Sequence, residues 1–332
     1  MKSRFKLLFW AAMMMAMTAC APAIGQTPTT TPPPSPTGSS LRGVFEGITP
    51  CSAQTRPLPQ IPADSDCELM TWKVILYQDS ASAAGTPTTY ILESAYGASQ
   101  ANTTSPAGGG APIALEGNWG IMKGTKTDPE AEVYQLYSKD SQVAVSFVKI
   151  SEDILHVLNR DRTLMLGNAA WSYTLNRTDN RMPDPLDGPV SSGPEATRPP
   201  IPAAPPGSSV LGVFEGRLPC HEVVFEVLKV TPYPGCLKLK SRLTLYVDQA
   251  TGLPSSYMYM GTSTIHEGRW TTLQGTKGDR DAVVYQLQLE DSRSPVSFLK
   301  VDENHLFLLD RNLNLLVGNA LFSYTLSRIE KQ

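Results

Sequence analysis

The stretch GSSVLGVFEGRLPC at residues 207–220 repeats the earlier stretch GSSLRGVFEGITPC at residues 38–51, at an offset of 169 residues. The same offset aligns Cys236 with Cys67, so each copy carries a second cysteine sixteen positions after the first. A match of this length and spacing indicates an internal duplication, in which one small domain is encoded twice.

The offset between the copies falls to 151 residues in their later parts. There EGNWGIMKGTK at 116–126 matches EGRWTTLQGTK at 267–277, and GNAAWSYTL at 167–175 matches GNALFSYTL at 318–326. The first copy therefore holds 18 additional residues within 80–112, a tract rich in Ala, Ser, Thr and Gly. The close match on both sides of this tract predicts one fold made twice.

A strand pattern is clearest at residues 283–289, VVYQLQL, where apolar side chains occupy every second position and Gln286 and Gln288 stand between them. A period of two is typical of a half-buried strand. Further strands are predicted at 243–247, 255–260, 296–301, 306–309 and 322–327. Short strands joined by tight turns, without a long amphipathic helix, predict an all-β antiparallel meander, either a barrel or a sandwich.

Two tracts rich in Pro, Ser and Thr divide the 332-residue chain. Residues 20–40 and 179–209 lack the apolar content of a packed core, and their composition favours extended, polyproline-like conformations. The β domains are therefore expected at 41–178 and 210–332. We expect the first tract to be a tether and the second to be a linker between the domains.

The first 20 residues, MKSRFKLLFWAAMMMAMTAC, have the pattern of an export signal. Three basic residues precede the apolar run from Leu7 to Ala19, which is shorter than the about 20 residues that span a bilayer. The small residues before Cys20 resemble the lipobox of bacterial lipoproteins. This resemblance implies removal of residues 1–19 and attachment of diacylglyceryl and a further acyl chain, such as palmitate, to Cys20.

Two or more acyl chains anchor a protein stably to a membrane. Ala21 and Pro22 follow the cysteine and neither is Asp, which by resemblance to the enterobacterial sorting rule implies the outer membrane, facing the periplasm. The alternative interpretation is an ordinary secretory signal that happens to end near a cysteine.

The net charge of the chain is −3, and without residues 1–19 it is −6, from 25 Lys and Arg against 31 Asp and Glu. Phosphate binding requires a basic surface. The composition therefore argues against a nucleic-acid partner. The partners that remain are a membrane, an envelope protein or a small ligand.

The motif GVFEGRLPC at 212–220 resembles the opening of the N-terminal domain of NlpE, a family of outer-membrane lipoproteins linked to copper homeostasis and envelope stress. The first copy matches through GVFEGITPC at 43–51. Gly-x-Trp motifs ending at Trp119 and Trp270, and Leu309-Asp310, extend the likeness. The resemblance implies a lipocalin-like barrel for each domain, and hence two tandem small antiparallel β-barrels.

The chain departs from the family pattern at the cysteines, because the family continues with Cys-x-x-Cys. Equal spacing in both copies favours the bridges Cys51–Cys67 and Cys220–Cys236, since each repeat then folds by itself. A thiolate pair that binds Cu(I) is the alternative.

Other candidate copper ligands lie in the second copy. Met258 and Met260 are two residues apart on a predicted strand, so both sulfurs share a face, and His221 and His266 are near in sequence. Packing of the methionines in the core is the alternative. No cofactor other than copper is suggested by the sequence.

Catalysis is not indicated. None of the four histidines, at 156, 221, 266 and 305, recurs in the other copy, and no G-x-S-x-G, phosphate-binding loop or H-E-x-x-H motif is present. We therefore expect a non-enzymatic, NlpE-like envelope lipoprotein with a role in copper homeostasis, or in sensing or binding at the envelope surface.

Two further functions remain open. One is a lipocalin-like carrier of a small hydrophobic ligand, and the other is a structural or adhesion module. For the carrier, the aromatic residues shared by both copies are equally suited to line a cavity or to fill a core. They are Trp119/Trp270, Tyr134/Tyr285, Phe147/Phe298 and Tyr173/Tyr324.

Overall fold

The computed structural model describes residues 35–329, apart from 53–54, 101–102, 140–141, 181–199, 202, 233–234, 262–263 and 290–293. The described residues belong to one compact unit. Among the described helices, none has the length and apolar character needed to cross a membrane. Cys20 and the predicted signal lie outside the described residues.

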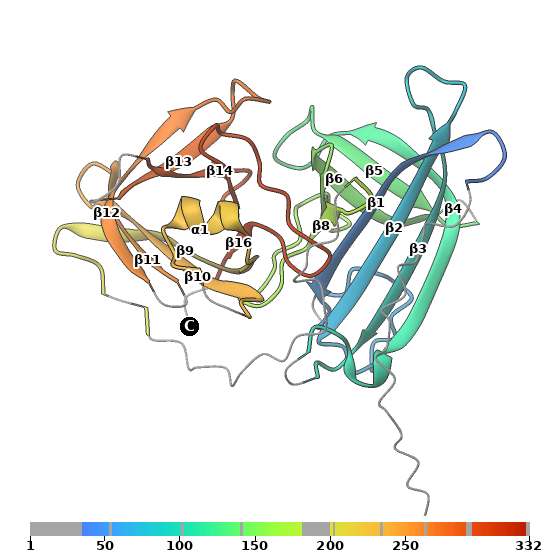
Figure 1. Ribbon diagram of the computed structural model, residues 1–332, viewed down its shortest axis with the longest axis horizontal. Helices are drawn as coiled ribbons and strands as arrows, with labels where there is room; N and C mark the ends of the chain where they lie inside the picture. The colour runs from blue at the N-terminus through green and yellow to red at the C-terminus, as the bar shows by residue number, and fades with distance from the viewer. Residues whose placement is uncertain are drawn as a thin grey trace, which may run out of the picture. The chain divides into compact units, whose positions relative to one another are not determined.

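The first copy is a closed antiparallel barrel in which each strand pairs with the next along the chain and β8 pairs with β1 (Figure 1). Its strands are β1 (Ser39–Pro50), β2 (Leu69–Asp79), β3 (Pro87–Gly97), β4 (Ala111–Lys123), β5 (Glu132–Tyr137), β6 (Val143–Ser151), β7 (Ile154–Val157) and β8 (Thr174–Arg177). A short 3-10 turn, η1 (Ala107–Gly109), precedes β4.

The second copy repeats this topology as a second closed barrel, with β16 paired to β9. Its strands are β9 (Ser208–Pro219), β10 (Lys238–Asp248), β11 (Pro254–Met260), β12 (Ile265–Gln274), β13 (Val283–Leu289), β14 (Val296–Lys300), β15 (His305–Leu308) and β16 (Thr325–Arg328). The predicted all-β fold, with two tandem lipocalin-like barrels, is confirmed.

The additional residues of the first copy extend one hairpin. β3 and β4 are 11 and 13 residues long, whereas their counterparts β11 and β12 have 7 and 10. The connection between β3 and β4, residues 98–110, is also longer than the connection at 261–264. The insertion therefore lengthens an existing hairpin and leaves the strand order unchanged.

Each barrel closes at a glycine of the GVFEG motif. A Cβ atom on Gly47 would lie 2.8 Å from the carbonyl oxygen of Thr174, and one on Gly216 would lie 2.4 Å from that of Thr325. No side chain fits at such a distance, so only glycine lets the first strand approach the last. Closure pairs the edge strands, which would otherwise expose unpaired backbone groups.

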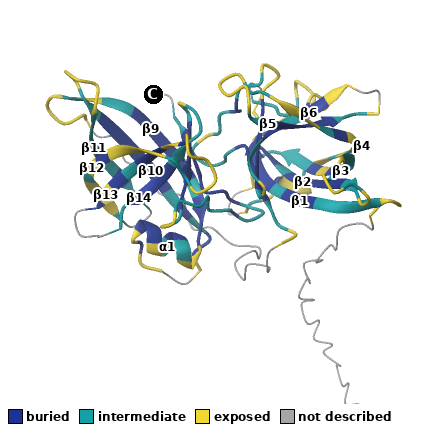
Figure 2. Cartoon of the chain, turned by 90° about the horizontal axis from the view of Figure 1, so that it is seen from above, coloured by how far each residue is buried: buried dark blue, intermediate teal, exposed yellow. Residues whose placement is uncertain are grey.

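Aromatic side chains fill both interiors, and buried residues concentrate on the strands (Figure 2). The Trp119 ring packs on Tyr134 at a centroid distance of 5.0 Å, and its Nε1 donates to Tyr77 O at 2.6 Å. Trp270 repeats both contacts in the second copy. The shared aromatic residues therefore belong to the packed cores of the barrels.

The segment between the two cysteines covers one end of each barrel. In the second copy it contains α1 (Glu222–Leu228; Figure 1). Val224, Val227 and Leu228 of this helix pack into the core. In the first copy Leu58 and Ile61 pack there instead. A helix of seven residues is too short to produce a clear helical period, which is why the sequence pattern did not predict it.

Replacing Gly216 with alanine is expected to destabilise the second barrel by about 3 kcal/mol, because the methyl group forces β9 away from β16. Urea unfolding of the whole protein measures the change. Gly278→Ala is the matched control, because its Cβ meets nothing within 4 Å. Equal stability of the two variants would contradict the role assigned to Gly216.

Candidate functional site

The outward faces of β8 and β16 meet each other. Leu175 and Leu326 point into their own barrels, so the alternate residues point outward. The hydroxyl groups of Thr174 and Thr325 are hydrogen-bonded at 3.0 Å. The 151-residue offset makes these two threonines equivalent, so the same position of each copy faces its own counterpart.

The loops before β8 and β16 make the same kind of contact. Ser172 and Ser323 are equivalent and share a hydrogen bond of 2.7 Å. Their neighbours Trp171 and Phe322 stack with their ring planes within 5° and their centroids 5.5 Å apart. The Arg217 guanidinium lies 5.6 Å from the Trp171 ring centroid, within range of a cation–π interaction.

His156 on β7 is fully buried at this interface. Its Nε2 lies 2.9 Å from the carbonyl oxygen of Met165, an acceptor only, so Nε2 carries the proton. Nδ1 therefore accepts from the Thr174 hydroxyl at 3.0 Å, and Thr174 accepts in turn from Thr325. Burial, followed by the adjacent His305, lowers the pKa of His156 to about 3, so this ring is neutral.

His305 on β15 completes the network from the second barrel. Its ring centroid lies 4.7 Å from that of His156, and its Nε2 also donates to Met165 O, at 3.1 Å. Nδ1 faces the Asp302 carboxylate at 2.8 Å. Burial acts to raise the pKa of Asp302, but the hydrogen bond and charge of His305 bring it below its usual range.

The symmetry of the interface is also broken at Asn176 and its equivalent, Ser327. Asn176 reaches across the interface: its Nδ2 donates to Asn319 O and Phe322 O, and its Oδ1 accepts from Gly318 N. The equivalent residue of the second copy is Ser327, whose shorter side chain makes no such bridge. Ser327 Oγ is buried without a hydrogen-bond partner among the described residues.

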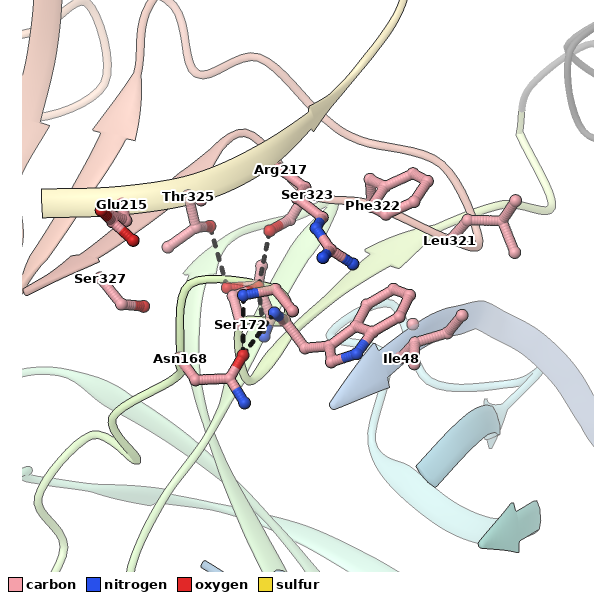
Figure 3. A pocket seen from close by; sticks show the side chains of 15 residues that line it. Ile48, Asn168, Ser172, Glu215, Arg217, Leu321, Phe322, Ser323, Thr325 and Ser327 are labelled. Atoms are coloured by element: carbon pink, nitrogen blue, oxygen red, sulfur yellow. Dashed lines mark hydrogen bonds between the residues drawn. The ribbon is translucent and has the colours of Figure 1, made fainter. Parts of the chain in front are cut away.

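A small cavity lies beside Ser327, with Glu215, Thr325 and Ser327 along one side (Figure 3). Its volume of about 10 Å³ is close to the least that admits one water molecule. The lining residues are Gly47, Ile48, Asn168, Ala170, Trp171, Ser172, Thr174, Glu215, Gly216, Arg217, Leu321, Phe322, Ser323, Thr325 and Ser327. The space suits a bound water and is too small for an organic substrate.

Glu215 is the carboxylate that lines this cavity. It is 1% exposed and forms an ion pair with Arg242, its cross-strand neighbour on β10. Burial lowers the pKa of Arg242. The first barrel has the same register, with Glu46 opposite Lys73. The Glu215 carboxylate is therefore held in an ion pair rather than being a free acid or base.

The predicted cysteine pairs are disulfides. Cys51 joins Cys67 with 5.2 Å between the Cα atoms, and Cys220 joins Cys236 with 5.8 Å. Each bridge fastens the segment that covers its barrel end. The thiolate alternative for a copper site does not apply to bridged sulfurs.

The structure does not bring the other candidate copper ligands together. Tyr257 and Tyr259 point into the barrel, so Met258 and Met260 lie on the outer face of β11. His266 lies on the inner side, stacked on Tyr259 and bonded to Leu228 O at 3.2 Å.

His221 is exposed at the start of α1, where its Nδ1 accepts from Val223 N. Within the described ranges, no group of three or more His, Cys, Asp or Glu side chains is arranged to hold a metal.

This interface was not predicted from the sequence. His156 aligns with Phe307 and His305 with Ile154, and the absence of a matching histidine was used above only as an argument against catalysis. The available signal was that each copy places a polar residue where the other has an apolar one.

Comparison of the chain with protein-family models, curated proteins and solved structures gives no match.

Replacing Ser327 with asparagine is expected to stabilise the protein by about 1 kcal/mol, because the longer side chain can make the bridge that Asn176 makes in the other copy. The reverse change, Asn176→Ser, is expected to cost about 1–3 kcal/mol, because it leaves buried backbone groups unpaired. Chemical denaturation of both variants measures the difference. A destabilising Ser327→Asn would show that the cavity does not accept the amide.

Stability is expected to fall as the pH drops below 6.5, because the unfolded chain then binds a proton at His156 that the folded chain does not. Between pH 7 and pH 5 this group alone removes about 2 kcal/mol of unfolding free energy. His156→Phe introduces the residue that the second copy has at the equivalent position, Phe307. It is expected to remove the contribution of His156 to the dependence of the unfolding free energy on pH. Parallel pH profiles for the variant and the native protein would contradict the assignment.

Proposed function

We propose that the protein is a non-enzymatic lipoprotein of the bacterial envelope, similar to NlpE, that binds a partner on the outer surface of a two-barrel module. Its anchor is the acylated Cys20, and residues 20–40 form the tether between membrane and module. The proposed location is the outer membrane, with the barrels facing the periplasm.

The observation that carries this proposal is the packing of aromatic side chains in the interior of both barrels. Trp119 and Trp270 lie in these cores and are fixed by equivalent hydrogen bonds to Tyr77 O and Tyr246 O. A carrier needs an internal cavity for its ligand, whereas here the shared aromatic residues pack on one another. Recognition therefore falls to the outer surfaces and loops, which favours the binding function over the carrier.

The non-enzymatic part of the proposal rests on the chemistry of the interface site. The cavity beside Ser327 has the volume of about one water molecule, and its carboxylate, Glu215, is ion-paired. His156 is neutral and fully buried, so it does not reach a substrate. These groups stabilise the structure rather than perform acid–base chemistry.

A role in copper homeostasis rests on the resemblance to NlpE and on Met258 and Met260, which share the outer face of β11. The histidines that the sequence suggested as additional ligands lie elsewhere. Copper(I) titration of the mature protein, compared with Met258→Leu/Met260→Leu, tests this role separately. Absence of bound copper would remove the copper function and leave the binding function standing.

Cys20→Ala is expected to abolish acylation of the N-terminus, because the thioether that holds the lipid forms on this cysteine, and so to remove the lipid anchor. Fractionation with mass spectrometry of the N-terminal peptide measures this change. Ala21→Asp is the matched control: it keeps the acylated cysteine and is expected to redirect the protein to the inner membrane. A soluble native protein with an unmodified Cys20 would refute the lipoprotein assignment.

A further inference from the structure

The contacts between the barrels join equivalent residues of the two copies. Thr174 meets Thr325, Ser172 meets Ser323, and Trp171 stacks on Phe322. Each pair is separated by 151 residues, the offset of the duplication. In a twofold-symmetric dimer, residues on the axis contact their own counterparts in the partner. The contacts therefore have the arrangement of a symmetric dimer interface.

Two further equivalent pairs lie beside this axis. Ile150 and Val301 pack against the same apolar cluster. The ring of His156 lies 6.3 Å from that of Phe307. The interface thus combines an apolar cluster, an aromatic stack and a hydrogen-bonded polar centre around a single approximate twofold axis.

The centre of this interface is excluded from water. Thr174, Thr325 and Asn176 are each at most 3% exposed, and both interface histidines are fully buried. The hydroxyl and amide groups there are paired across the interface, so separation of the barrels would expose or unpair them. Buried, well-packed central groups are the ones that hold protein interfaces together.

We propose that the protein is a fused dimer, in which the two barrels hold each other through a self-complementary interface and do not depend on residues 181–199 to stay together. The partner that each barrel face fits is another copy of the same domain, supplied here within one chain. A covalent link raises the effective concentration of the second barrel, and the specific geometry comes from the interface. The module then acts as one body, which goes beyond the proposed binding function.

The test is to cut the full chain. A recognition sequence for a specific protease replaces part of 186–192, and the folded protein is cleaved there under native conditions. At micromolar concentration the two halves are expected to elute together from a size-exclusion column, with the mass of the uncut protein by light scattering. Halves that elute separately would overturn the proposal.

Two variants locate the contact. Ser323→Arg places a charge against Ser172, and Trp171→Glu replaces a half-buried loop residue, so neither change enters a barrel core. Both are expected to separate the cleaved halves, or to raise their dissociation constant at least tenfold. Thr271→Arg, on the exposed face of β12, is the matched control and should leave them associated.

Circular dichroism of the uncut variants verifies that the barrels remain folded. If both folded variants kept the halves together as tightly as the control, the interface described here would be the wrong one. The outcome is independent of the proposed anchor and partner, because it concerns only the association of the two barrels.

Discussion

The structure depends on the closure of each sheet, at the seam where the first strand meets the last. β1 and β8 share only a short register, Phe45 with Arg177 and Glu46 with Asn176. Gly47 follows directly and lets the two backbones approach. Without this pairing each meander would be an open sheet with two unpaired edges, which can pair with other chains and aggregate. The repeated GVFEG motif is therefore a structural signature of the seam in both copies.

The last strand of each barrel, which closes the sheet at the seam, also forms the contact between the barrels through its outward-facing residues. In β8, Leu175 packs into the core while Thr174 and Asn176 face the other barrel. A change in how a barrel closes would thus displace the interface as well. This coupling explains why so short a strand carries buried polar residues: their hydrogen-bond partners are in the other copy, as buried polar groups require.

Much of the fold could be predicted from the sequence. The alternation at 283–289 and the repeated motifs predicted the strands and their duplication, because both signals are local. Closure could not be derived from alternation, since a sandwich has the same period and the β1–β8 pairing joins residues more than 100 positions apart. The interface was missed because a side chain that faces another domain occupies the same strand positions as one that faces solvent. Strand period correctly predicted that Met258 and Met260 share a face, but it could not place His266 on the opposite one.

The two copies share some features and differ in others. Both copies keep the seam glycines, the Trp–Tyr core contact and the disulfide, because each barrel needs them to fold. The first copy alone has the extended β3–β4 hairpin, and the second alone has α1 at its barrel end. The hairpin serves no requirement that is common to both barrels, and α1 packs on its core where the first copy uses Leu58 and Ile61. If the module binds one partner rather than two identical ones, the partner must distinguish the barrels, and these are the surfaces on which they differ most.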